Sequence, residues 1–311
     1  SYVCRMIGQN GRRGALMITM NIKHPDIEQF VAMKHDLTKV TGANVSIKIS
    51  DEFMRAVENK EKFTLQFPVN SNSPTITKEI EAIDLWILIV ESATKTAEPG
   101  LMMWDNIINN LPAESYADVG FKTITTNPCG EIPLSAYDSC RLISINLKNF
   151  VTNPFKGPKF DFYKLYEVVT QAMRLSDDLV ELEIEKLERI IKVCDTKDEK
   201  ALWKSLLKAC KEGRRTGLGT HGLADALARL NVRYDSDKAV KITEKIYEVL
   251  RNASYTESVN LSKERGAFGV FDWEKEKDNE YIKRLPQEIQ DMIKEFGRRN
   301  ISILTNAPTG S

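Results

Sequence analysis

The sequence predicts an α/β fold with a mainly parallel sheet, because strand-like runs alternate with helical segments along the chain. Two further observations agree with this class. The 311 residues are enough to bury a large core. Hydrophobic residues make up 42% and charged residues 28% of the chain, as in globular rather than disordered proteins. No repeat, low-complexity tract or linker divides the sequence, so we expect one domain over residues 1–311.

Strands and helices are expected to alternate in the first part of the chain. After Pro25, which is typical of a helix start, Ile27, Phe30, Val31 and Met33 fall roughly on one helical face. Short apolar or alternating runs predict strands at 15–22, 43–50 and 63–69. Helical spacing predicts helices over 24–36, 51–59 and 76–96.

The second part of the chain is mainly helical in pattern. A strand-like run covers 140–151, and a short strand over 300–307 closes the sequence. The charged stretch 273–284 is expected to be a solvated face. Helical spacing predicts helices over 163–183, 201–213, 222–230 and 239–266.

Charge and cysteine content exclude several classes of protein. Lys+Arg and Asp+Glu both number 44, which gives no reason to expect a nucleic-acid or anionic-membrane partner. The most apolar window, 83–90, is too short to span a bilayer, and no signal peptide is recognisable. Five scattered cysteines without a CxxC pair fit a reducing cytosol, so a cytoplasmic location is expected. Both ends of the sequence look cut, which suggests a piece of a longer protein.

One short segment, NPCGE at 127–131, combines an amide, a thiol and a carboxylate. Asn127, Cys129 and Glu131 alternate, so in an extended loop their side chains would point to one side. Pro128 and Gly130 lie between them, and both favour a tight loop over a continuing strand or helix. The segment is therefore a candidate site for a polar substrate.

Several interpretations of Cys129 are compatible with the residues alone. A buried cysteine is usually a small apolar residue. A thiolate nucleophile needs a base, and the three histidines (His24, His35 and His221) are distant in sequence. A zinc site needs four clustered ligands, which the spacings do not supply, so no metal site is expected. One-electron chemistry needs a protonated thiol, and a neighbouring carboxylate favours that form.

The segment NPCGE resembles the active-site loop of ribonucleotide reductase large subunits. Five further phrases resemble family sequences in the family's order. They are QNGRRGALMITMNIKHPDIEQFV, TAEPGLMMWDNI, RRTGLGTHGLADALARL, ESVNLSKERGAFGVFD and ILTNAPTGS, and NPCGE itself continues as NPCGEIPLSAYDSCRLISINL. The resemblance implies a ten-stranded α/β barrel with the cysteine loop inside it, and a chain that reduces ribonucleotides to 2′-deoxyribonucleotides.

The resemblance also implies roles for individual residues. Cys129 would carry a transient thiyl radical, Glu131 would be the general base and Asn127 would hold the ribose. Cys140 would be one member of the redox pair, whose partner this chain lacks, since Cys4 does not match the family position. Pro308, Thr309, Gly310 and Ser311 would form the phosphate-binding turn. Gln9, Arg12 and Arg13 would belong to the specificity loop.

Cofactor and partners follow from the resemblance too. The 11-residue step from Cys129 to Cys140 looks like the adenosylcobalamin-dependent class. The alternative is a large subunit that takes its radical from a diiron partner subunit, or an isolated fragment that only binds nucleotide. The implied partners are a ribonucleotide substrate, a dNTP or ATP effector, thioredoxin or a similar thiol reductant, and a second copy of the full-length chain.

The remaining cysteines, His221 and three glycines have simpler interpretations. Cys4 is expected to be a small buried residue, and Cys194 and Cys210 are expected on the core faces of helices. His221 is expected to pack or to form a hydrogen bond. Gly217, Gly219 and Gly222 resemble a nucleotide-binding loop only in spacing.

Overall fold

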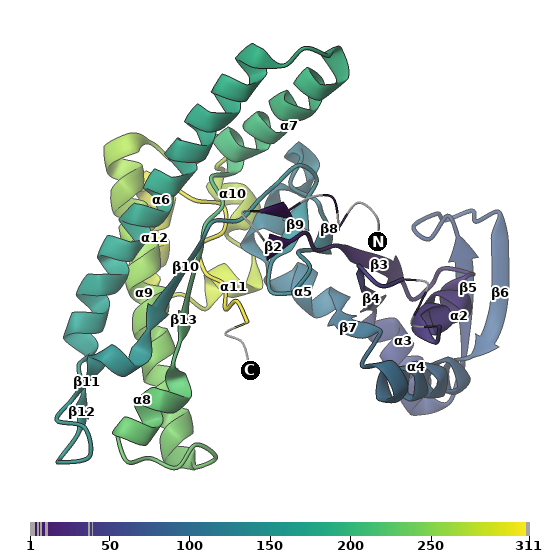
Figure 1. The fold of residues 1–311 in the computed structure, drawn as a ribbon, viewed down its shortest axis with the longest axis horizontal. Helices are drawn as coiled ribbons and strands as arrows, with labels where there is room; N and C mark the ends of the chain where they lie inside the picture. Colours follow the sequence, from purple (N-terminus) through teal and green to yellow (C-terminus); the bar gives the residue numbers. More distant parts are fainter. Residues whose placement is uncertain are drawn as a thin grey trace. The chain divides into compact units, whose positions relative to one another are not determined.

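The computed structural model describes residues 4, 6, 8–9, 12–36, 38 and 40–308, with only the backbone given for 8–9 and 12–13. The chain forms two compact units (Figure 1). The first unit comprises Ser1–Asn110 and Thr125–Pro133, and the second comprises Leu111–Ile124 and Leu134–Ser311. The chain passes between them after Asn110, within β8 (Thr123–Thr126) and within β9 (Pro133–Ser135).

The first unit is built on a parallel sheet with the strand order β3-β4-β7. These strands are β3 (Met17–Asn21), β4 (Asn44–Ile49) and β7 (Gly100–Met103). Helices α2 (Ile27–Val31) and α3 (Asp51–Asn59) follow the first two strands. The Ser50 hydroxyl caps α3 by accepting from the Phe53 amide at 3.2 Å. The predicted strands at 15–22 and 43–50 and the predicted helix at 51–59 are confirmed.

The prediction of one helix over 76–96 is wrong at its start. Residues Ile76–Glu81 form strand β6, which pairs antiparallel with β5 (Lys62–Phe67). Helix α4 begins only at Ala82 and ends at Thr96. Ala82, Leu85 and Ile89 are buried at helical spacing, whereas β6 is largely exposed. The β6 segment lacks the apolar periodicity that α4 has, and pairing with β5 decides its structure.

The second unit contains a parallel pair, β10 (Leu142–Asn146) and β13 (Gly217–His221). The segment after residue 300 joins β13 through a parallel bridge between Leu218 and Leu304. There the Leu218 amide donates to the Ile303 carbonyl at 2.9 Å. A Cβ at Gly219 would lie 2.0 Å from the Thr305 carbonyl oxygen, so this approach requires glycine. Gly219 of GLGTHG therefore serves the close packing of a strand.

Two long helices cover this unit, and they lie side by side in Figure 1: α6 (Phe162–Val193) and α9 (Asp237–Arg265). The buried positions Leu165, Val169 and Met173 of α6 pack in the same core as Ile246 and Leu250 of α9. The predicted helices from residue 163 onward are confirmed. The other longer helices are α7 (Lys197–Gly213), α8 (Leu223–Arg229) and α12 (Gln287–Phe296).

The remaining elements are short. They are η1 (Ala32–Lys34), α5 (Trp104–Asn110), η2 (Pro112–Val119), η3 (Leu147–Phe150), β11 (Val151–Thr152), β12 (Lys159–Phe160), α10 (Trp273–Glu276) and α11 (Glu280–Lys283). The expectation that 273–284 is wholly solvated is wrong at Glu276. This carboxylate is fully buried and pairs with Arg298 at 2.6 Å. The partner lies 22 positions away, so no local pattern could have indicated the pair.

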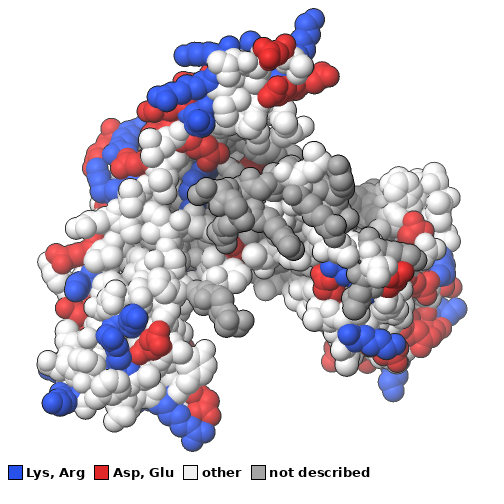
Figure 2. Space-filling view, viewed as in Figure 1, with Lys and Arg blue, Asp and Glu red and all other residues white. Residues whose placement is uncertain are grey.

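The surface carries charges of both signs. Figure 2 shows basic and acidic side chains interspersed on the face in view, which fits equal totals of 44 for Lys+Arg and Asp+Glu. No helix in the described part of the chain is long and apolar enough to cross a membrane.

Candidate functional site

Residues 127–132 form a tight turn in the first unit. The Gly130 amide donates to the Asn127 carbonyl at 3.0 Å, which places Pro128 and Cys129 at the two central positions. Gly130 has a φ of +87°, a left-handed conformation that glycine adopts at little cost. The backbone N–H of Asn127 donates to the Ile132 carbonyl at 3.1 Å and closes the turn. The expected tight loop is confirmed.

The side chain of Asn127 holds the Glu131 carboxylate. Its Nδ2 donates to Glu131 Oε2 at 2.6 Å, a short bond of the charge-assisted kind. Its Oδ1 accepts from the Ile132 amide at 3.0 Å. The idea that these side chains meet by alternating along an extended loop is wrong, because the chain turns between them. The amide therefore orients the carboxylate instead of merely standing beside it.

Cys129 lies at the tip of this turn with its side chain exposed. A Cβ built on the neighbouring Gly130 would meet nothing within 4 Å, so the space at Gly130 is open. Asn44, at the start of β4, donates through Nδ2 to the Pro128 carbonyl at 2.5 Å. The turn thus presents a thiol outward while the sheet of the first unit anchors its base.

Cys140 lies in the second unit, two residues before β10, and is half-buried. A Cβ built on Gly217 would lie 2.4 Å from Cys140 Sγ and 2.9 Å from Leu142 Cδ2. Both side chains therefore share one face of the β10–β13 pair. On the same strands, Ser144 Oγ and His221 Nδ1 form a hydrogen bond of 2.8 Å. The expectation that His221 packs or forms a hydrogen bond is confirmed.

Ion pairs fix the backbone on both sides of Cys140. Asp138 pairs with Arg215 at 2.6 Å, and both side chains are only 1% exposed. Arg141 Nε donates to Glu183 of α6 at 2.6 Å. Buried charges of this kind require their partners, so the position of Cys140 is strongly determined. The sequence analysis missed these residues, because the partners lie 42 and 77 positions apart in the chain.

Cys210 is a buried thiol on α7 that accepts a hydrogen bond from Arg141 Nη2 at 2.9 Å. Burial raises the pKa of Cys210 to about 11, although the nearby Arg141 charge opposes the rise. The thiol is therefore protonated at neutral pH. The predicted core position of Cys210 is confirmed, and so is the burial of Cys4. Cys194 differs, because it is the half-buried C-cap of α6 and not part of a helix face.

The other candidates are described only in part. β1 (Gly8–Gln9) and β2 (Arg12–Arg13) pair antiparallel, with Gln9 opposite Arg12, but their side chains lie outside the described residues. Pro308 is exposed, and Thr309, Gly310 and Ser311 lie outside the described residues. Among the residues that the structure describes, no group of three or more His, Cys, Asp or Glu side chains could hold a metal ion.

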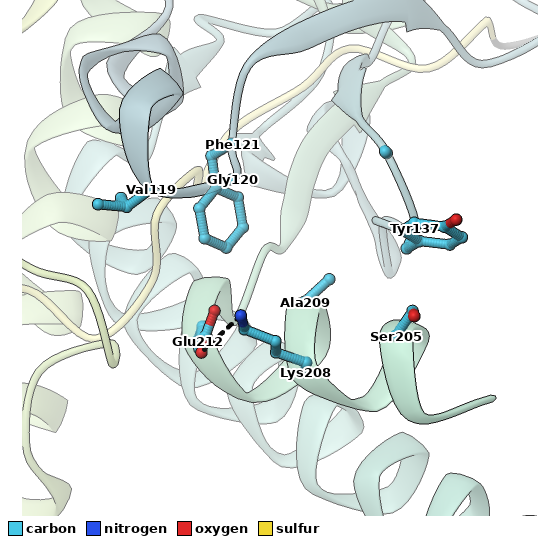
Figure 3. A pocket seen from close by; sticks show the side chains of 9 residues that line it. Val119, Gly120, Phe121, Tyr137, Ser205, Lys208, Ala209 and Glu212 are labelled. Atoms are coloured by element: carbon cyan, nitrogen blue, oxygen red, sulfur yellow. Dashed lines mark ion pairs between the residues drawn. The ribbon is translucent and has the colours of Figure 1, made fainter. Parts of the chain in front are cut away.

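A pocket of about 330 Å³ opens in the second unit between η2 and α7 (Figure 3). Tyr137, which has a φ of +62° and is 54% exposed, lies at one side of it, and Phe121 lies at the other. Lys208 and Glu212 of α7 form an ion pair of 3.9 Å on its wall. None of the candidate residues named above lines this pocket.

Comparison with known proteins identifies the family. The family model for the ribonucleotide reductase barrel domain matches residues 2–311. A vitamin B12-dependent ribonucleoside-diphosphate reductase of Thermoplasma acidophilum is 36% identical over 87% of this chain and 33% of its own length. One of Mycobacterium tuberculosis is 31% identical over 96% of this chain and 37% of its own length. The ribonucleoside-diphosphate reductase large chain of Neurospora crassa is 26% identical over 98% of this chain and 34% of its own length.

The chain thus spans about a third of the length of these relatives. The family model, by contrast, covers it almost from end to end. On this match, the chain belongs to the ribonucleotide reductase barrel-domain family.

Proposed function

We propose that this chain is the catalytic part of a ribonucleotide reductase, which converts ribonucleoside di- or triphosphates to 2′-deoxyribonucleotides for DNA synthesis. The observation that carries the proposal is the 2.6 Å hydrogen bond from Asn127 to Glu131, two residues beyond an exposed Cys129 thiol. A thiol oxidised to its radical can remove a hydrogen atom, an oriented carboxylate can accept a proton, and an amide can hold a hydroxyl group. Relatives named as ribonucleoside-diphosphate reductases support it.

In this proposal the three residues of the turn act on one ribose. Cys129, as a thiyl radical, takes the hydrogen atom from C3′ and later returns it. Glu131 accepts the 3′-hydroxyl proton while the 2′-hydroxyl leaves as water. Asn127 orients Glu131 and holds the ribose hydroxyls. The support for these roles is the shared turn, which brings the amide and the carboxylate together.

Cys140 is proposed as one member of the redox pair. Two thiols supply two electrons and two protons, and they end as a disulfide while the substrate loses its 2′-oxygen as water. Thioredoxin or a similar thiol reductant would then restore the dithiol. No disulfide forms among the described cysteines, and we assign the redox partner of Cys140 to none of Cys4, Cys194 and Cys210.

Adenosylcobalamin is the proposed cofactor. The residues present are suited to it, because the Cys129 thiol is exposed and the space beside Gly130 is open. When bound, the cofactor supplies the one-electron oxidising equivalent that converts the Cys129 thiol to a thiyl radical. Relatives named as vitamin B12-dependent favour it over a radical imported from a diiron partner subunit.

Further properties of the complete protein belong to the same proposal. Both units would form one catalytic domain, part of a ten-stranded α/β barrel with the Cys129 turn inside it. Pro308–Ser311 would bind the substrate phosphates. Gln9, Arg12 and Arg13 would relay the identity of a bound dNTP or ATP effector to the substrate base. The full-length protein would act as a cytoplasmic homodimer.

The test uses the full-length protein with CDP or CTP and dithiothreitol, with and without adenosylcobalamin. We expect a deoxycytidine nucleotide only when the cofactor is present, and none from a Glu131→Ala variant that still binds nucleotide. If turnover required a separate diiron subunit, adenosylcobalamin would be the wrong cofactor and the radical would come from that subunit. A full-length protein that binds nucleotide but forms no deoxynucleotide under either condition would refute the proposed activity.

A further inference from the structure

A closed ring of hydrogen bonds lies at the carboxyl end of β13. Asn306 Nδ2 donates to the Tyr247 hydroxyl at 3.2 Å. The Tyr247 hydroxyl and Thr220 Oγ1 are 2.9 Å apart, and Thr220 Oγ1 donates to Asn306 Oδ1 at 3.4 Å. If Tyr247 donates to Thr220, each hydroxyl hydrogen has an acceptor and the ring closes in one direction.

The ring joins three separate elements of the second unit. Thr220 belongs to β13, Tyr247 to α9, and Asn306 to the segment that follows the bridge at Leu304. The Thr220 amide adds a further bond to Asn306 Oδ1 at 3.3 Å. Thr220 is only 5% exposed, so the ring has a buried anchor. Asn306 itself is exposed, and without these bonds its side chain would be free to rotate.

The ring also lines a polar cavity of about 480 Å³, together with His221, Asp225 and Tyr234. Asn306 stands two residues before Pro308, where the proposed phosphate-binding turn begins. A backbone turn that binds phosphate through its N–H groups depends on a fixed direction of entry of the chain. The ring holds the Asn306 side chain to β13 and α9, two residues before Pro308.

We propose that the Tyr247–Thr220–Asn306 ring fixes the entry to the phosphate-binding turn, so that Tyr247 is a positioning residue for the phosphates of the nucleotide substrate. This inference rests on the proposed function, which assigns phosphate binding to Pro308–Ser311. Tyr247 acts through Asn306 and does not itself contact the substrate. Its removal therefore weakens phosphate binding more than it changes the chemical step.

The experiment compares Tyr247→Phe with Tyr255→Phe in the full-length protein. Tyr255 loses the same hydroxyl from the same helix, but it interacts with Tyr281 and not with Asn306. The readouts are the ratio of the Kd for cytidine to the Kd for CDP, and kcat and KM for CDP. If the lost hydrogen bond has the usual net strength, Tyr247→Phe should lower the ratio of Kd for cytidine to Kd for CDP about 2- to 12-fold. The KM for CDP should rise by a similar factor. We expect kcat to change less than twofold.

Thr220→Val provides a second way to open the ring, because it keeps the shape of the side chain and removes the hydroxyl. It should act as Tyr247→Phe does, and the double variant should be no worse than the stronger single variant. Equal Kd ratios for Tyr247→Phe and Tyr255→Phe would overturn the positioning role alone. A wild-type protein that binds CDP no better than cytidine would overturn the phosphate assignment, and the positioning role with it.

Discussion

Replacing Asn127 with alanine removes both side-chain hydrogen bonds that orient Glu131 and close the turn. The bond to the Glu131 carboxylate is charge-assisted and is worth about 1.5–3 kcal/mol, and the bond from the Ile132 amide about 0.5–1.5 kcal/mol. Asn127 is half-buried, so hydrogen bonds to water would compensate for part of this lost free energy. We therefore expect a loss of about 2 kcal/mol in transition-state stabilisation, about a 30-fold fall in kcat/KM.

The assay is steady-state reduction of CDP by the full-length protein, with Asn44→Ala as the matched control. Asn44 also supports the turn, but it does so through a hydrogen bond to the Pro128 carbonyl. Asn44→Ala should therefore cost much less than Asn127→Ala. If the two variants were equally impaired, or if Asn127→Ala kept a third or more of the wild-type kcat/KM, the orienting role of Asn127 would be wrong.

Three further predictions concern Cys140 and its surroundings. Gly217→Ala should displace Cys140, because its Cβ would lie 2.4 Å from Sγ; an unchanged rate of alkylation of Cys140 by iodoacetamide would argue against this. Arg215→Met should lower the free energy of unfolding in urea by about 3–5 kcal/mol, since it leaves the Asp138 charge buried without its partner; a loss below about 1 kcal/mol would contradict the pairing. The pKa of Cys210, raised by burial to about 11, means that the unfolded thiol ionises at lower pH than the folded one. Its contribution to stability is complete below about pH 8.5 and is lost towards pH 11, by roughly 3 kcal/mol. Thermal unfolding of Cys210→Ala should lack this component, and identical pH profiles would refute it.

Elements with strong local signals were predicted well. Helix α3 occupies the predicted residues 51–59, because Ser50 caps it and Phe53 and Ala56 provide its buried face. The start of α4 was not predicted, because β6 has little burial and gains its structure from pairing with β5. Local sequence specifies a cap or an amphipathic face, whereas strand pairing depends on a partner elsewhere in the chain.

In the candidate site, too, locally determined features were predicted and contacts between distant residues were not. The tight loop at Cys129 followed from Pro128 and Gly130, which act locally. The ion pairs around Cys140 involve Glu183 and Arg215, 42 and 77 positions from their partners Arg141 and Asp138, and no local pattern indicates them. Composition and spacing left several chemistries open for Cys129. The choice among them came from the ordered phrases shared with a family, and the family match shows the family but does not test the role of Cys129.

The central claim is that Cys129 carries the radical, and one comparison tests it most directly. Full-length Cys129→Ala and the control Cys194→Ala would be incubated with CDP, adenosylcobalamin and dithiothreitol, and deoxycytidine nucleotide would be measured. Neither cysteine is in a disulfide, and Cys194 is the C-cap residue of α6 in the second unit. The account predicts no product from Cys129→Ala and nearly wild-type product from Cys194→Ala. Deoxynucleotide formation by Cys129→Ala would contradict it.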